Sequence, residues 1–168
     1  MQRRRLLALG AVSAAVLAIG GGTLSLLSPG LDGGRLSAGA RELFVAIGRA
    51  MLEGSLPSDV RGSTAALAGL IERIDALQAA LPPHAQAELS QLLSLLASSP
   101  GRHALAGLST PWPQATVAEI QDALQSMRTS GISLRQQAYH ALHDIVGGAY
   151  FSDAQTWGRI GYPGPVKI

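Results

Sequence analysis

The feature that most constrains the fold is a series of apolar residues at helical spacing. Between residues 58 and 79 the apolar positions recur at i, i+3, i+4 and i+7, namely Leu67, Leu70, Ile71, Ile74 and Leu77. Because an α-helix has about 3.6 residues per turn, this spacing places all of these side chains on one face. Such a face is typical of a helix that packs against a core. The sequence has no long alternation of apolar and polar residues, so we predict an all-α protein.

The same periodicity predicts further helices. We expect them near residues 37–53 and 58–79, from Pro82-Pro83 to the SSPG sequence at 98–101, near 102–108, from Thr116 to Ser130-Gly131, and from Ser133 onward. Further core positions are expected at Phe44, Ile47, Met51, Leu89, Leu92, Leu93, Leu96, Val117, Ile120, Leu124, Met127, Leu134, Ala138, Leu142, Ile145 and Val146. Two capping boxes are indicated, Thr116 with Glu119 and Ser133 with Gln136. The Gly147-Gly148 pair is expected to interrupt the last helix.

These elements predict an irregular bundle of about five helices, with an N-terminal signal or anchor helix and an extended C-terminal tail. The corresponding organisation is a twin-arginine signal or membrane anchor at 1–27, a Gly/Pro linker at 28–36, the helical bundle at 37–151 and an aromatic Pro-Gly tail at 152–168.

The N-terminal leader has the composition of an export signal. Arg3, Arg4 and Arg5 precede 22 residues without a charge, from Leu6 to Leu27. A segment of this length can span a bilayer, but its glycines dilute its hydrophobicity. Paired arginines before a mildly apolar segment indicate the twin-arginine (Tat) route, which carries folded proteins. The alternatives are a general secretory signal and an uncleaved anchor.

The expected signal residues are the pair Arg3 and Arg4 with Leu6 and Leu7 in the apolar positions of the motif. A sequence of the small-x-small form typical of leader cleavage sites occurs at Ala38-Gly39-Ala40. It lies well after the apolar segment and at the expected start of the first helix.

The positive charge of the chain belongs to this leader. Of 13 basic residues three are in the leader, and the first acidic residue is Asp32. The remainder therefore has ten basic against 11 acidic residues, a net charge of −1. Because no basic stripe with interleaved aromatics is present, we expect no nucleic-acid partner. The absence of cysteine excludes disulfides and thiolate metal sites within the chain.

Candidate catalytic residues are few. His140 and His143 lie three positions apart on one expected helix, a spacing that can bring two imidazoles to one metal. A third ligand is missing, and Asp144 is expected to point away from their shared face. We interpret the two histidines as surface residues near a helix C-terminus. His84 and His103 are isolated in the sequence.

Aromatic residues are concentrated near the C-terminus. Four of the seven fall within the last nineteen residues: Tyr150, Phe151, Trp157 and Tyr162. Pro163 and Pro165 restrict the backbone around them to extended conformations. Trp and Tyr are frequent at interfaces because they combine apolar area with a polar group. The rings are therefore expected either to cap the chain's own bundle or to form a partner surface, and both roles are compatible.

Several segments together resemble a known family. They are "ELFVAIGRAMLEGSLP", "ELSQLLSLLASSPGRHALAGL", "PWPQAT", "LRQQAYHALHDIVGGAYF" and "TWGRIGYPGP". The chain resembles, over residues 36–165, the small Tat leader-containing subunits of bacterial membrane-associated flavoprotein dehydrogenases, such as gluconate 2-dehydrogenase subunit three and the sorbitol dehydrogenase small subunit. The C-terminal pattern W-x-x-I-G-Y-P-G-P, from Trp157 to Pro165, is its most specific part.

The resemblance implies an accessory role without a cofactor or catalytic residue in this chain. A large subunit of the glucose–methanol–choline oxidoreductase type would hold FAD, and a c-type cytochrome completes some such complexes. The small subunit supplies the Tat signal, so that both cross to the periplasmic side of the inner membrane through the Tat translocon. The partner interface is then expected at Trp157, Ile160, Gly161, Tyr162, Pro163 and Pro165. The rival interpretations are a stand-alone periplasmic helical module for a small apolar ligand and an independent enzyme.

Overall fold

The computed structural model describes residues 28–165, and this part of the chain is mostly helical. Its five long helices are α2 (Ala38–Met51), α3 (Val60–Ala79), α4 (Pro83–Ala97), α6 (Val117–Arg128) and α7 (Ser133–Phe151). The short elements are β1 (Leu31–Asp32), β2 (Arg35–Leu36), the one-turn α5 (Ser99–Gly101), the π-helix η2 (Arg102–Ala106) and the 3-10 helix η3 (Ala154–Ile160). The all-α prediction and the number of long helices are confirmed for the described residues.

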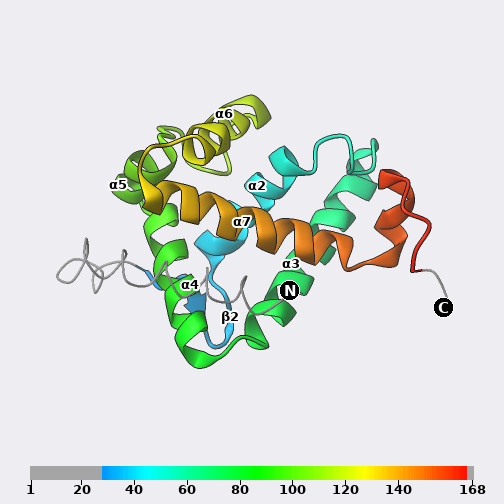
Figure 1. Ribbon diagram of the computed structural model, residues 1–168, viewed down its shortest axis with the longest axis horizontal. Coiled ribbons are helices and arrows are strands. Elements are labelled where there is room, and N and C mark those ends of the chain that lie inside the picture. Colours follow the sequence, from blue (N-terminus) through cyan, green and yellow to red (C-terminus); the bar gives the residue numbers. More distant parts are fainter. Residues whose placement is uncertain (1–27, 166–168) are drawn as a thin grey trace.

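Helix α2 is the central element of the bundle. It contacts α3, α4, α6 and α7, and half of its residues are buried. Figure 1 shows α7 crossing the molecule in front of α2, with α6 near one end of α7 and α3 and the C-terminal segment near the other. An apolar helix surrounded on several sides gives a single core, which explains why α2 carries small and apolar residues around most of its circumference.

The apolar positions predicted from periodicity form this core. Of the stripe in α3, Leu67, Leu70, Ile71 and Ile74 are buried, whereas Leu77 is half-buried. The stripe of α4 is buried throughout, and in the other helices only Met51 and Val117 remain half-buried. These two residues lie at helix ends, where fewer neighbours surround a side chain.

Within residues 28–36, assigned from the sequence to a linker, residues 31–36 form an ordered β-hairpin. Leu31 pairs with Leu36 and Asp32 with Arg35 in an antiparallel register. The turn consists of Gly33 and Gly34, which have φ values of 55° and 78°. A two-residue hairpin turn of this kind needs positive φ at both positions, which glycine adopts without a steric cost. The Gly33-Gly34 pair was the signal in the sequence from which this hairpin could have been found.

The connection from α4 to α6 is held by two buried polar side chains. The guanidinium of Arg102 in η2 donates hydrogen bonds to the carbonyls of Leu108 and Ser109 at 3.2 and 3.3 Å. The indole of Trp112 is buried and donates to the carbonyl of Leu96 at 2.7 Å. The helix predicted near 102–108 is therefore a short π-helix whose following loop is tied to α4.

The predicted capping boxes have different outcomes. At α6 the Thr116 hydroxyl accepts from the Glu119 backbone N–H, and the Glu119 carboxylate accepts from the Thr116 backbone N–H, as predicted. At α7 the prediction is wrong, because the N-cap is Ile132 and it makes no side-chain cap. The amide of Gln136 instead donates to the carbonyl of Ser130 at 2.7 Å. Because the Gln136 side chain bonds to Ser130, it does not form the predicted cap with Ser133.

The expected interruption of the last helix at Gly147-Gly148 is also wrong. Helix α7 continues without a break to Phe151. Glycine costs a helix about 1 kcal/mol relative to alanine. Here Val146 and Ala149 on either side of the pair are buried in the core, and their packing outweighs that local preference.

The capping box of α6 gives a pH-dependent prediction. Hydrogen bonds from the backbone and hydroxyl of Thr116, and a further one from Thr110, hold the pKa of Glu119 below its ordinary value. A carboxyl whose pKa is lower in the folded state stabilises the fold above the unfolded-state pKa, and this contribution is lost as the pH falls through the lower folded-state pKa. We expect Glu119→Gln, which retains the capping geometry, to melt below the wild type at pH 7.

The difference in Tm between wild type and Glu119→Gln is expected to shrink as the pH falls below about 4, near the ordinary pKa of glutamate. The measurement is thermal melting by circular dichroism from pH 7 to pH 3. Glu42→Gln, at an exposed position of α2, is the control. A difference that stays constant over this range would show that Glu119 does not act through its charge.

Candidate partner-binding surface

The C-terminal segment is attached to the bundle by Arg73 of α3. Its Nε donates to the carbonyl of Ala149 at 2.7 Å, and its Nη1 lies 3.4 Å from the carboxylate of Asp153. Asp153 is also the N-cap of η3 and accepts from the backbone N–H of Gln155 at 2.9 Å. One arginine therefore satisfies a carbonyl near the end of α7 and fixes the start of the segment that follows.

The end of α7 is itself buried. Tyr150 is 1% exposed, and its hydroxyl donates to the carbonyl of Ser55 at 2.8 Å. The ring of Phe151 lies edge-on to that of Tyr150, with 5.1 Å between the ring centroids. Of the four C-terminal aromatics, Tyr150 therefore belongs to the core of the bundle. This agrees with the expectation that some of these rings pack on the chain's own bundle.

The expected extended course of the tail is wrong for residues 154–160, which form the 3-10 helix η3. Thr156 is buried, and its hydroxyl donates to the carbonyl of Asp153 at 2.7 Å. The indole of Trp157 donates to the carbonyl of Phe151 at 2.8 Å. These bonds join residues three and six positions apart and curl the chain back towards α7. The prolines that favour extended backbone begin only at Pro163, after this turn is complete.

Beyond η3 the chain closes around Trp157. Gly161 adopts a left-handed conformation with φ of 69°, and the N–H of Tyr162 donates to the carbonyl of Trp157 at 3.0 Å. The two rings are edge-on with centroids 5.3 Å apart. A Cβ built on Gly164 would lie 3.4 Å from the indole, so the backbone there passes directly over the ring. Trp157 is therefore half-buried within its own segment.

The remaining predicted interface residues are exposed. Ile160 is 52% exposed and Tyr162 is 44% exposed, and Gly161, Pro163 and Pro165 are exposed beside them. We call Ile160 and Tyr162 the apolar tail surface. Exposed apolar residues scattered singly are ordinary, but these two lie together on a segment that is anchored to the bundle. The structure thus separates the predicted set into a half-buried support, Trp157, and an exposed surface.

The histidine pair does not lie in this surface. His140 and His143 are exposed on α7, and Tyr139 lies between them with its ring centroid 5.3 and 5.7 Å from theirs. The expectation that Asp144 points away is wrong, because its carboxylate lies 3.2 Å from Nδ1 of His143. Within residues 28–165, no three His, Cys, Asp or Glu side chains gather in an arrangement that could hold a metal ion.

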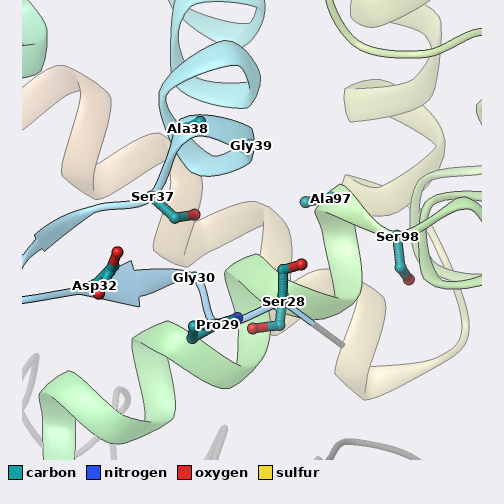
Figure 2. Close-up of a pocket in the computed structure, with 10 residues that line it drawn as sticks. Ser28, Pro29, Gly30, Asp32, Ser37, Ala38, Gly39, Ala97 and Ser98 are labelled. Atoms are coloured by element: carbon teal, nitrogen blue, oxygen red, sulfur yellow. The ribbon is translucent and has the colours of Figure 1, made fainter. Parts of the chain in front are cut away.

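A hollow of about 580 Å³ lies elsewhere, between the hairpin, the start of α2 and the end of α4 (Figure 2). Its volume is in the range of small-molecule sites. Three of the four serine hydroxyls in its lining are, however, used in local bonds. Ser37 caps α2, Ser94 donates to the Ser90 carbonyl at 2.7 Å, and Ser98 donates to the Leu95 carbonyl at 2.7 Å. The hollow does not lie between α3, α4 and α7, where an internal apolar cavity would favour a module for a small apolar ligand.

The predicted signal residues Arg3, Arg4, Leu6 and Leu7 lie outside the described residues. Among the helices of residues 28–165, none is long and apolar enough to cross a membrane. The residues that sequence reasoning missed are Arg73 and Asp153, which hold the tail. Their spacing of 80 positions left no local signal by which they could be paired.

Comparison with models of known protein families, with curated proteins and with solved structures gave no match. The class that the structure defines is therefore an irregular, mostly helical bundle with an anchored aromatic C-terminal segment.

Proposed function

We propose that this chain is the non-catalytic small subunit of a periplasmic, membrane-associated flavoprotein dehydrogenase. In this proposal an FAD-containing large subunit of the glucose–methanol–choline type oxidises an alcohol, sugar or sugar acid. The present chain supplies the Tat signal for both subunits and stabilises the large subunit at the inner membrane. A c-type cytochrome subunit is a further candidate component of the complex.

The observation that carries the proposal is the apolar tail surface. A disordered tail loses conformational entropy when it binds, whereas a segment already fixed by Arg73 and Trp157 loses little. Holding Ile160 and Tyr162 outward on such a segment favours their use in contact with another protein. The sequence resemblance over residues 36–165 indicates an FAD-containing large subunit as the partner. The arginine-rich leader indicates Tat export as the route.

The mechanism of such a subunit is transport and attachment. Because the Tat route carries folded proteins, a large subunit without its own signal can receive FAD in the cytoplasm and then cross while bound to this chain. The contact must survive the passage, which requires an interface of the permanent type, commonly above 2,000 Å² in total. The apolar tail surface is in this proposal one part of that larger interface.

Purification of the tagged chain from membranes of its own host tests the proposal directly. We expect a larger protein to co-purify and the preparation to show the visible absorbance spectrum of a bound flavin. Purification of the chain with no flavoprotein, under conditions in which it is exported and folded, would contradict the proposed function.

The tail surface itself can be tested by substitution. We expect Ile160→Ala with Tyr162→Ala to weaken co-purification of the flavoprotein at least about ten-fold, since an interface aromatic that acts as a hot spot contributes about 2 kcal/mol or more. Both side chains are exposed, so thermal melting of the isolated chain should change little.

Ile132→Ala with Val60→Ala is the matched control. These residues are 58% and 84% exposed and lie at the starts of α7 and α3. The control pair should leave co-purification unchanged. Equal losses of co-purification in both double variants would show that exposed apolar residues act non-specifically. Unchanged co-purification in both would show that the tail is not part of the interface.

A further inference from the structure

The hairpin that follows the leader is bound to the bundle by two side chains of α3. The carboxylate of Asp75 accepts from the backbone N–H of Leu36 at 2.8 Å and forms an ion pair with Arg41. The fully buried Gln78 donates its side-chain amide to the carbonyl of Gly34, at the tip of the hairpin. Strand β2 and the turn are thus held to a helix about 40 positions later in the chain.

Helix α4 holds the other end of the hairpin. The hydroxyl of Ser90 accepts from the backbone N–H of Leu31 at 3.0 Å, and the carbonyl of Gly30 accepts from the backbone N–H of Ser37 at 2.9 Å. Gly30 is buried, and a Cβ added to it would overlap the Ser90 carbonyl and lie 2.6 Å from Cβ of Leu93. Only glycine fits this close approach, so the described fold is closely packed from residue 30 onward.

The small-x-small sequence Ala38-Gly39-Ala40 lies at the edge of this packed region, with Ala38 exposed, Gly39 half-buried and Ala40 buried. It forms the first turn of α2, and Ser37 caps that turn by accepting from the Ala40 backbone N–H. Ala40 is 0% exposed, and a Cβ on Gly39 would lie 3.5 Å from Cβ of Ala97. Figure 2 shows this turn beside Ala97, with Gly30, which directly precedes β1, also lining the hollow.

A peptidase needs its substrate as an extended segment, so a bond within a helix is cut only after local unfolding. Opening residues 38–40 requires loss of the Ser37 cap and of the first turn of α2. It also brings Leu36, which is only 3% exposed in the folded chain, into contact with solvent, and it breaks the bonds to Asp75. The small-x-small sequence is therefore protected as long as the bundle is folded.

We infer that the hairpin is a permanent part of the folded domain and sets the limit of leader removal. A cut that releases the leader from the folded chain falls before Gly30, and Ala38-Gly39-Ala40 is a helix start rather than a processing site. The small residues are needed there because α2 begins against α4. The inference concerns the chain's own N-terminus and does not depend on the proposed dehydrogenase partner.

The exported form gives the first test. The full chain is expressed in a bacterium with a Tat system, recovered from the membrane and periplasm, and measured by intact mass and N-terminal sequencing. We expect an N-terminus at residue 30 or earlier, including the uncut Met1. An N-terminus at any later residue, above all at Arg41, overturns the inference.

Proteolysis of the purified full chain in mild detergent gives a second test that is independent of export. Elastase cuts after small residues, and in the wild type we expect Ala38 and Ala40 to be cut at least about a hundred-fold more slowly than in the urea-unfolded chain. Asp75→Ala, which removes the acceptor for Leu36 and the partner of Arg41, should accelerate this cut about ten-fold.

The matched control is Asp122→Ala, an exposed acidic residue on α6, which should leave the rate unchanged. Rapid cutting at Ala38 or Ala40 in the folded wild type would overturn the inference. Equal rates for Asp75→Ala and the wild type would also count against it, because the bonds to α3 would then not protect the site.

Discussion

Leu70→Ala is expected to lower the free energy of unfolding by about 2–5 kcal/mol, the range found for buried leucines replaced by alanine. Leu70 is 0% exposed and lies on the face of α3 that packs against α2. The cost has two parts, the loss of buried apolar surface and the cavity that remains when the neighbours do not collapse into it. The measurement is urea unfolding followed by circular dichroism on the chain from residue 28 onward.

The contact partner of Leu70 allows this prediction to be refined. A Cβ added to Gly48 of α2 would lie 2.9 Å from Cδ2 of Leu70 and 3.1 Å from Cδ2 of Leu67. We therefore expect Gly48→Ala alone to be destabilising through overpacking, by about 1–3 kcal/mol. In the double variant the added methyl group occupies space that Leu70→Ala vacates, so the two costs should not add.

Val60→Ala is the control on the same helix, because Val60 is 84% exposed, and its effect should stay within about 0.5 kcal/mol. A cost for Leu70→Ala below about 1 kcal/mol would mean that α3 does not pack on α2 in the described way. If the costs of Gly48→Ala and Leu70→Ala were strictly additive, the two positions would not be in contact.

The second large effect is expected on export. Replacing Arg3, Arg4 and Arg5 together by lysine preserves the charge of the leader but should reduce export to a small fraction of the wild-type level. A receptor that recognises arginine pairs uses the planar guanidinium group with its several fixed donors, which the ammonium group of lysine cannot reproduce. All three positions are changed because either neighbouring pair could serve. The measurement is fractionation of cells into cytoplasm, membrane and periplasm.

The large subunit should follow the same distribution, because in the proposed function it has no signal of its own. It is expected to accumulate in the cytoplasm with its flavin and to reduce an artificial electron acceptor there. Arg35→Lys, at an exposed position of the hairpin, is the control and should leave export unchanged. Normal export of the triple lysine variant would exclude the twin-arginine route, and a correctly placed large subunit would exclude joint transport.

The aromatic residues of the tail divide between two roles, support of the tail's own structure and the proposed contact with a partner. Trp157 supports the turn by its bond to the carbonyl of Phe151, and Tyr162 rests edge-on against it while remaining partly exposed. A variant of Trp157 is therefore expected to disturb the tail's own structure, whereas variants of Ile160 and Tyr162 report on contact with a partner. This division makes the two exposed residues the better test of the proposed interface.

What the sequence by itself determined was local. The helical faces of α3 and α4 could be read from apolar spacing because residues three and four positions apart share a helix face in any context. The starts of α2 and α6 could be read for the same reason, since Ser37 and Thr116 cap backbone groups within three residues. The exposed tail residues could be named from composition, although their exposure could not.

Only the tertiary structure decided the elements whose conformation depends on distant partners. Helix α7 continues through Gly147-Gly148 because the residues around the pair are buried against other helices, and η3 forms where the chain is held by Arg73 of α3. The segment before α2 became an ordered hairpin through Asp75 and Ser90, which follow it by 39 and 59 positions along the chain. Such bonds outweigh local propensities of about 1 kcal/mol per residue, and no local pattern in the sequence records which distant residues will form them.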